Sequence, residues 1–223
     1  MTPNSWMELA RASTPDGDEL ILRRRGDEFD IRFNGWEVMA SRTSRSEEAM
    51  ARLAYEDLRR APRAVLIGGL GMGYTLRAAL DLAGAAARIV VAELVPAVVE
   101  WVRGPLADLA GNPLADRRVD VRICSIAEVL AASPQLFDVI LLDTDNGPES
   151  VLHPANMFLY SLDGIDLAMQ AVKSNGVVGF WSADRSVAFE HKLDAAGLYW
   201  RRAEVAARDD GPEHWIYLVK RDG

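Results

Sequence analysis

Short apolar runs alternate with amphipathic segments along most of the chain, from about residue 63 onward. The runs are apolar at nearly every position, which is typical of strands buried on both faces of a parallel sheet. The segments between them carry apolar residues at helical spacing. This alternation predicts a sheet that helices cover on both faces. The expected strands are residues 64–67, 88–92, 119–123, 138–142 and 176–181, and the expected helices lie at 74–83, from 96, around 127–130 and at 162–172.

The first 45 residues follow a different pattern, in which apolar and polar positions alternate with period two. Residues 29–33 alternate in this way, Asn34–Gly35 is a strong hairpin turn, and residues 36–39 return as the partner strand. Residues 19–23 add a third strand. We therefore expect a three-stranded antiparallel module over residues 1–45. Such a module is too small to be stable alone, so it should pack on the main body or on another subunit.

The remaining residues, 46–223, are expected to form one domain. It begins with a helix that Ser46 opens and whose apolar stripe comprises Met50, Leu53, Ala54 and Leu58. It ends with a helix near 186–196 and with two strands at 198–203 and 214–219, which form a C-terminal hairpin. The predicted fold class is a doubly wound, mostly parallel α/β sheet of the Rossmann-like type, with the antiparallel hairpin closing one side.

Composition narrows the class of protein. The 223 residues are 49% hydrophobic, which is enough to build a sizeable core. A net charge of −8 argues against nucleic-acid binding and indicates solubility, while an acidic cleft for a cationic substrate stays open. One cysteine permits no intrachain disulfide, and three widely separated histidines predict no metal site. No signal peptide or membrane span is recognisable, so we expect a cytoplasmic protein.

The strand at residues 64–67 runs directly into a glycine-rich turn and then into a helix. Gly69, Gly71 and Gly73 give a GxGxG spacing. Glycine allows tight turns and lets main-chain N–H groups approach a ligand closely. In this strand–turn–helix setting the spacing indicates a nucleotide-type site, and the alternative is a tight turn with nothing bound.

Acidic residues follow two other expected strands. Glu93 ends the strand at 88–92, where a carboxylate can accept hydrogen bonds from both ribose hydroxyls of a nucleoside. Asp143 and Asp145 lie just past the strand at 138–142, at the edge where open α/β sheets bind ligands. Two close carboxylates can hold an ammonium group, and one can act as general base. The alternatives are an ordinary strand-end acid and a polar turn, respectively.

In their order along the chain these segments resemble the spermidine/spermine synthase family, over essentially the whole sequence. The resemblance rests on VLIGGLGMGYTLR, VVAELVP, RVDVRICSIAEVL, FDVILLDTDNGP and SNGVVGFW. It implies the class I S-adenosylmethionine methyltransferase fold preceded by a small β domain. It also implies that Glu93 binds ribose, that residues 143–148 are the catalytic acidic segment, and that the protein is a homodimer formed through its N-terminal strands.

Several positions depart from the family pattern. Met72 stands where the glycine loop commonly has an acid, and Ser125 stands where an acid usually lies near the adenine, so Ser125 is the candidate there. The paired acids are one residue closer together than usual. Residues 46–50 show no Tyr-His-Glu run of the kind that helps to hold the polyamine, and Val95 replaces a frequent acid. Nucleoside binding is therefore better supported than polyamine specificity.

Three functions remain after these observations. The first is transfer of an aminopropyl group from decarboxylated S-adenosylmethionine to a small-molecule amine, with Asp143 or Asp145 as the base. The second is a methyltransferase that uses ordinary S-adenosylmethionine as co-substrate, which Met72 in place of an acid slightly favours. The third is a non-catalytic nucleoside-binding protein that retains the fold. None of the three is expected to have a nucleic-acid or membrane partner or a bound metal.

Overall fold

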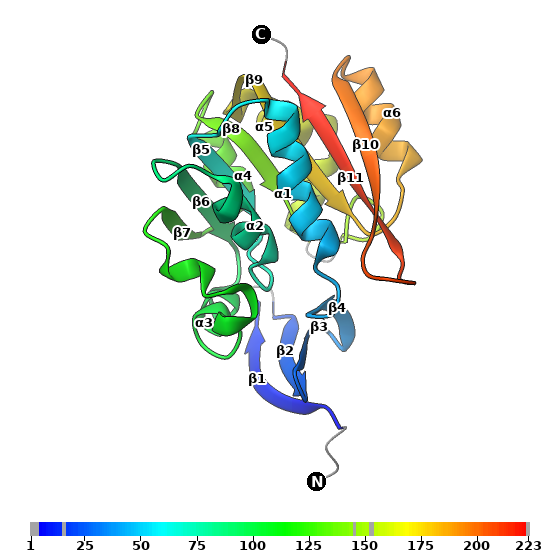
Figure 1. The fold of residues 1–223 in the computed structure, drawn as a ribbon. Coiled ribbons are helices and arrows are strands. Elements are labelled where there is room, and N and C mark those ends of the chain that lie inside the picture. The colour runs from blue at the N-terminus through cyan, green and yellow to red at the C-terminus, as the bar shows by residue number, and fades with distance from the viewer. Residues whose placement is uncertain (1–4, 15–16, 145, 152–153, 222–223) are drawn as a thin grey trace.

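The computed structural model describes residues 5–14, 17–144, 146–151 and 154–221, which form two sheets (Figure 1). The smaller sheet is antiparallel, has the strand order β1-β2-β3-β4, and lies at the N-terminal end of the molecule. Its strands are β1 (Met7–Ser13), β2 (Glu19–Arg25), β3 (Glu28–Phe33) and β4 (Trp36–Ala40). The sequence predicted three of these strands and missed β1, so the expectation of a three-stranded module was wrong.

The larger sheet has seven strands in the order β10-β11-β9-β8-β5-β6-β7. Strands β9, β8, β5, β6 and β7 are parallel, and β11 and β10 complete the sheet antiparallel to them. The strands are β5 (Ala64–Gly68), β6 (Arg88–Glu93), β7 (Val119–Ile123), β8 (Phe137–Leu142), β9 (Val172–Ser182), β10 (Tyr199–Ala206) and β11 (Glu213–Lys220). The predicted fold class is confirmed, including the C-terminal hairpin at one side of the sheet.

Six α-helices and three short 3₁₀ helices connect these strands within the described residues. The α-helices are α1 (Arg45–Leu58), α2 (Tyr74–Leu82), α3 (Pro96–Arg103), α4 (Ile126–Ala131), α5 (Leu162–Ala171) and α6 (Val187–Ala195), and the 3₁₀ helices are Ala107–Ala110, Pro113–Ala115 and Pro154–Tyr160. The residue that precedes α1 is Ser44, so the prediction that Ser46 opens this helix was wrong. No helix among the described residues is long and apolar enough to cross a membrane.

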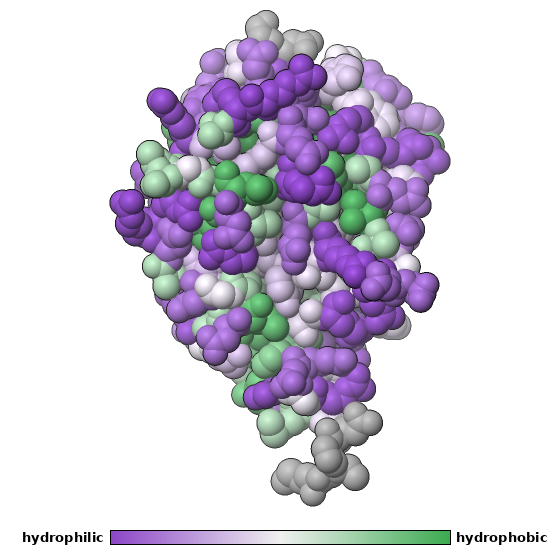
Figure 2. Space-filling view, in the orientation of Figure 1, coloured by the Kyte–Doolittle hydropathy of each residue, from purple (hydrophilic) through white to green (hydrophobic). Residues whose placement is uncertain are grey.

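Side chains of the central strands alternate between two cores, as strand geometry requires. Val65 and Ile67 of β5 belong to the core under α1, α2 and α3, whereas Leu66 belongs to the core under α4, α5 and α6. Helix α1 crosses the near face of the sheet in Figure 1. In the same orientation, Figure 2 shows mostly hydrophilic side chains over this face, because α1 turns its apolar stripe inward.

The N-terminal sheet packs on the main body, as expected from its size. Leu20, Leu22 and Ile31 are buried in the same continuous core as Met50 of α1. The division into domains at residues 45 and 46 stays a prediction, because a shared core does not define where a domain ends.

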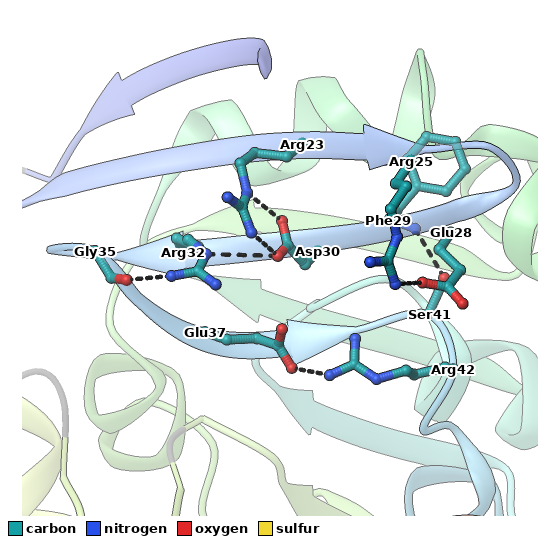
Figure 3. Close-up of polar contacts among 10 residues, drawn as sticks. All are labelled: Arg23, Arg25, Glu28, Phe29, Asp30, Arg32, Gly35, Glu37, Ser41 and Arg42. Atoms are coloured by element: carbon teal, nitrogen blue, oxygen red, sulfur yellow. Dashed lines mark hydrogen bonds and ion pairs between the residues drawn. The ribbon is translucent and has the colours of Figure 1, made fainter. Parts of the chain in front are cut away.

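Ion pairs lie along the small sheet, and those of Arg23 with Asp30 and of Arg25 with Glu28 join β2 to β3 (Figure 3). Asp30 of β3 is fully buried and accepts hydrogen bonds from the Arg23 guanidinium, with one N–O distance of 2.8 Å. Arg32 lies 3.5 Å from the same carboxylate. Arg42, just after β4, pairs with Glu37. A buried carboxylate that is paired in this way fixes strand positions rather than offering a reactive group.

The carboxyl ends of the parallel strands point toward the small sheet (Figure 1). Between β5 and β8 the strand order reverses, since β5 continues to β6 on one side and β8 continues to β9 on the other. Open α/β sheets bind ligands outside the carboxyl ends of their strands at such a switch point. The glycine loop follows β5, and Asp143 follows β8, so both lie at this position.

Candidate active site

The glycine loop adopts a backbone that other residues rarely accept. Gly69, Gly71 and Gly73 have φ angles of 85°, 53° and 89°. A Cβ on Gly69 would lie 2.1 Å from the carbonyl oxygen of Asp143, and a Cβ on Gly71 would lie 3.2 Å from Met39 Sδ. The first glycine therefore allows close contact with the end of β8, and the second allows close contact with β4. Binding of a nucleoside by this loop stays a prediction.

Glu93 holds the glycine loop in place from the end of β6. It is 8% exposed, and its two carboxylate oxygens accept hydrogen bonds from Leu70 N–H (2.9 Å) and Val95 N–H (2.8 Å). Burial raises the pKa of Glu93, and these backbone N–H groups oppose that effect. A carboxylate has about four acceptor positions. Acceptor capacity is therefore left over, so ribose binding by Glu93 stays a prediction beside the observed role in fixing the loop.

Asp143 lies where β5, β8 and α2 meet. Its backbone N–H donates to Gly68 O (2.9 Å), which extends the pairing of β8 with β5 by one residue. The Thr75 hydroxyl, in the first turn of α2, donates to Asp143 Oδ2 at 2.7 Å. Burial raises the pKa of Asp143 to about 6, although the hydrogen bond from Thr75 acts in the opposite direction. A carboxyl group with this pKa can exchange a proton near neutral pH.

Glu47, in the first turn of α1, is a second carboxyl group at this place, and the sequence analysis did not select it. Burial raises the pKa of Glu47 to about 7, and the neighbouring Asp143 carboxylate adds to the increase. Two carboxyl groups that interact in this way titrate as a pair. Both carboxyl groups therefore bind a proton at a higher pH than they would in water.

A chain of hydrogen bonds orients Glu47. The buried Ser46 hydroxyl donates to Glu47 Oε2 at 2.6 Å and lies 2.8 Å from His214 Nδ1. Which of Ser46 and His214 donates in the second contact depends on the tautomer of the ring. The His214 ring packs edge-on against Trp181, with ring centroids 4.7 Å apart. Glu47 is thus positioned by groups from α1, β11 and β9.

Glu47 and Asp143 line one small cavity of about 60 Å³. Its described lining comes from β4, α1, the glycine loop, α2 and the ends of β8 and β9, and its ionisable groups are Glu47, Asp143 and the Tyr74 phenol. Two buried polar atoms on its wall, Thr144 Oγ1 and Trp181 Nε1, have no hydrogen-bond partner. A buried polar atom without a partner costs about 1–3 kcal/mol. Such atoms point to a polar ligand or water in the cavity.

The other predicted site residues lie apart from this carboxyl pair or outside the described structure. Ser125 caps α4, because its Oγ accepts a hydrogen bond from Ala127 N–H at 3.2 Å. Met72 is buried and lines the cavity where an acid was expected. Asp145 lies outside the described residues. Within the described part of the chain, no group of three or more His, Cys, Asp or Glu side chains is placed to hold a metal ion.

The seven-stranded sheet, with a glycine loop and acids at its switch point, defines a Rossmann-like α/β protein. Residues 44–193 match the spermine/spermidine synthase domain, so the chain belongs to the spermine/spermidine synthase family. It is 31% identical over 164 residues to a polyamine aminopropyltransferase of Mycobacterium tuberculosis and, equally, to one of Mycobacterium bovis. This match covers 72% of the chain and 30% of each relative, so the chain spans less than a third of the relatives' length.

Solved structures show the same fold. The spermidine synthase from Thermotoga maritima superposes with a TM-score of 0.78 at 19% identity, over 96% of this chain and 72% of that one. A spermidine synthase in complex with the transition-state analogue AdoDATO superposes with a TM-score of 0.77 at 18% identity and the same coverage. At these identities the likeness concerns the fold. The recognition made from the sequence motifs is thereby confirmed.

Proposed function

We propose that the chain transfers an aminopropyl group from decarboxylated S-adenosylmethionine to a small-molecule amine. The observation that carries this proposal is the carboxyl pair of Glu47 and Asp143 beside the glycine loop. Family membership and the names of the relatives support it, since those relatives are polyamine aminopropyltransferases. The proposal extends to Asp145, which follows Asp143 by two residues in the sequence.

The charge of the cavity separates the two candidate donors. Ordinary S-adenosylmethionine ends in a group that carries a carboxylate, whereas its decarboxylated form ends in an ammonium alone. We call the cavity of about 60 Å³ that Glu47 and Asp143 line the inner cavity. Among the described residues that line it there is no Lys, Arg or His, and the two acids are Glu47 and Asp143. A carboxylate brought beside these acids would meet like charge, whereas an ammonium would be attracted. The pair therefore favours the decarboxylated donor and a cationic acceptor over methyl transfer.

The chain's own share of the reaction is positioning and proton removal. The sulfonium of the donor supplies the electrophilic carbon. Asp143, held by Thr75, takes a proton from the acceptor ammonium and leaves a neutral amine with a free electron pair. That electron pair forms the new C–N bond while the C–S bond breaks, and sulfur keeps the bonding pair as a neutral thioether. Methylthioadenosine and a protonated secondary amine are the products.

The glycine loop fits a nucleoside donor, but the inner cavity is narrow. A volume of about 60 Å³ is enough for roughly two water molecules, whereas small-molecule pockets measure roughly 300–1,000 Å³. Met39 of β4 lies directly against Gly71 and occupies part of the space beside the loop. Donor binding is therefore expected to displace this flexible side chain.

Calorimetric titration tests the donor site. We expect binding of decarboxylated S-adenosylmethionine and methylthioadenosine, and weaker binding of ordinary S-adenosylmethionine. Gly71→Ala should weaken nucleoside binding at least tenfold, because its methyl group meets both positive φ and Met39. Gly197→Ala is the matched control, since Gly197 also has positive φ but has nothing within 4 Å of the added Cβ. No binding of any of the three nucleosides would overturn both enzyme functions, and preference for the ordinary form would favour the methyltransferase.

Two expectations accompany the proposal. The resemblance to the family implies a homodimer formed through the N-terminal strands, and sedimentation of the purified chain tests this. A cytoplasmic location is the second expectation, and fractionation of the host cell tests it. Neither expectation affects the chemistry proposed for Asp143.

A further inference from the structure

The proposed reaction leaves one proton on the protein in every turnover. The donor sulfonium and the acceptor ammonium together carry two positive charges, and of the groups that they become only the new secondary ammonium is charged. The remaining proton is the one that Asp143 takes from the acceptor, and it must reach solvent before the next turnover. Substrate that fills the inner cavity of about 60 Å³ leaves no room there for bulk water. The proton therefore needs a way out on another side of the carboxyl pair.

Such a path begins at Glu47 and consists of two hydrogen-bonding groups. The Ser46 hydroxyl is fully buried and lies 2.6 Å from Glu47 Oε2 and 2.8 Å from His214 Nδ1. Both distances are within hydrogen-bond range. A serine hydroxyl can donate one hydrogen bond while it accepts another, and either nitrogen of a histidine ring can hold the proton. Carboxyl, hydroxyl and imidazole thus form an unbroken chain from α1 to β11.

This chain ends at a second cavity, which we call the outer cavity. It measures about 310 Å³, lies between the small sheet and the C-terminal hairpin, and includes Thr43, Ala183, Pro212 and His214 in its lining. This volume is enough for roughly ten water molecules. The His214 ring is half-buried, and within the described part of the chain its Nε2 has no hydrogen-bond partner. Water in the outer cavity can therefore contact the nitrogen that Ser46 does not.

The surroundings of His214 keep its ring neutral near pH 7. Burial lowers the pKa of His214, and the Asp184 carboxylate opposes this effect. The ring packs edge-on against Trp181, which carries no charge. The ionisable side chains that line the outer cavity with His214 are Glu37, Arg42, Glu47 and Arg208. Those that act on Glu47 from its other side are Glu48, Tyr74 and Asp143. A ring whose charged form is disfavoured in this way accepts a proton at one nitrogen and releases one from the other instead of storing it.

We propose that Ser46 and His214 form a proton relay that carries the acceptor's proton from the Glu47–Asp143 pair to solvent in the outer cavity. This inference rests on the proposed function for the reaction that supplies the proton. The protonated Glu47 carboxyl gives its proton to Ser46 Oγ while the Ser46 hydroxyl proton moves to His214 Nδ1. The Nε2–H bond of the ring then breaks, its proton goes to water, and its electron pair stays on the nitrogen. The carboxyl pair can then accept the next proton, and exchange with water returns the ring to its starting tautomer.

His214→Asn separates a proton relay from a group that only holds Ser46 in place. The asparagine amide can occupy the position of Nδ1 and keep a hydrogen bond with Ser46, but it cannot pass a proton on. We expect kcat to fall at least tenfold and KM for 1,4-diaminobutane to stay within threefold. Imidazole at millimolar concentration should restore at least half of kcat, because the outer cavity has room for the free base. The matched control is His191→Asn in α6, where the side chain is exposed, and it should change neither value.

Ser46→Ala removes the middle of the relay and shows where imidazole acts. It should lower kcat as much as His214→Asn does, but imidazole should not restore the loss, because the gap beside Glu47 stays. Equal restoration of both variants would overturn the relay, since imidazole would then take the proton from the carboxyl pair directly. A kcat within threefold of the wild type in either variant, or a folded His214→Asn variant that imidazole does not restore, would overturn it as well.

Titration of the His214 ring by nitrogen-15 NMR tests the relay without turnover. Besides its own titration, the wild-type ring should show a second inflection near pH 7, where the Glu47 carboxyl titrates. Ser46→Ala and Glu47→Gln should both remove this inflection. Glu48→Gln is the matched control, because it removes the same charge from the next residue of α1, where the side chain is exposed, and it should keep the inflection.

The NMR result also keeps the two proposals apart. If the second inflection appears and depends on Ser46 in a chain that has no transferase activity, the relay stands and only the proposed function fails. Identical titration curves in Ser46→Ala and the wild type overturn the relay, and so does loss of the inflection in Glu48→Gln. Thermal unfolding identifies a variant that misfolds, and comparison of the wild type with Glu47→Gln then decides.

Discussion

Strand β8 carries an aspartate near its start and another just past its end, and the two have opposite surroundings. Asp138 is almost fully buried and accepts four hydrogen bonds, from Arg60 (2.6 Å), Lys173 (3.2 Å) and the backbone N–H groups of Arg63 (2.8 Å) and Ala64 (2.9 Å). Burial alone would raise the pKa of Asp138, but these partners lower it to about 2. Asp143 has the Thr75 hydroxyl as its side-chain partner and a pKa raised to about 6.

The different partners and pKa shifts of Asp138 and Asp143 distinguish an acid that stabilises the fold from one that is able to exchange a proton. A carboxylate whose acceptor positions are filled by cations and N–H groups stays ionised and holds the chain together. A carboxylate that is desolvated beside another acid holds its proton more tightly and can exchange it near neutral pH. Asp138 lies in β8 and Asp143 directly follows it, and the two look alike in the sequence. We therefore assign a stabilising role to the acid at the amino-terminal edge of the sheet, and the proposed chemistry lies at the carboxyl-terminal edge.

Asp143→Asn should produce the largest effect on activity. Removal of the group that takes the acceptor proton is expected to lower kcat by about 10²–10⁴-fold. Nucleoside binding should change little, because the amide keeps the hydrogen bond with Thr75. Steady-state release of methylthioadenosine measures kcat. Activity within threefold of the wild type would mean that Asp143 is not the base, and Asp145 would take its place.

Asp138→Asn should affect stability instead. The lowered pKa implies that the ionised Asp138 stabilises the fold by about 2 kcal/mol. Because its folded pKa is depressed, this contribution is present above about pH 4 and is lost as the pH falls through about 2. Urea unfolding at pH 7 should therefore show a loss of about 2–3 kcal/mol, with kcat unchanged in the folded fraction. A variant as stable as the wild type would contradict the structural role.

The carboxyl pair should have a smaller effect on stability, with the opposite dependence on pH. Its folded pKa values lie above those of ordinary Asp and Glu, so the folded state binds more protons than the unfolded chain between about pH 4 and 7. Stability from this pair is therefore greatest below about pH 4 and falls as the pH rises through 7. In Glu47→Gln, the loss of unfolding free energy between pH 4.5 and 8 should be smaller than in the wild type by on the order of 1–2 kcal/mol. Urea unfolding across this range measures it, and a pH dependence identical to that of Glu48→Gln would argue against the pair.

Most of the fold could be predicted because the central strands are apolar throughout and because glycines mark the turns beside them. Residues 119–123 match β7, and the glycine loop lies where its spacing predicts. Strand β1 was missed because a bulge between Glu8 and Ala10 interrupts the alternation of Met7–Ser13, and because the strand is exposed or half-buried throughout. It is an edge strand whose structure depends on pairing with β2, and the local pattern holds little information about such pairing.

The site was predicted in part. Asp143 was found because it follows a buried strand, whereas Glu47 was not among the residues predicted for the site. A signal for Glu47 was present, because Glu47, Met50 and Ala54 are spaced at i, i+3 and i+7 and share one helix face. Met50 and Ala54 are fully buried. The hydrogen bonds that tie Glu93 to Leu70 and Val95 could not be predicted, since backbone donors leave no trace in the residue pattern.

Analysis of the products of one reaction tests the central claim most directly. The wild-type chain is incubated with decarboxylated S-adenosylmethionine and 1,4-diaminobutane, and both products are quantified by mass spectrometry. Methylthioadenosine and the aminopropylated amine are expected in equal amounts, and both should be lost in Asp143→Asn. Transfer of a methyl group instead, or no product from a chain that binds both substrates, would contradict it.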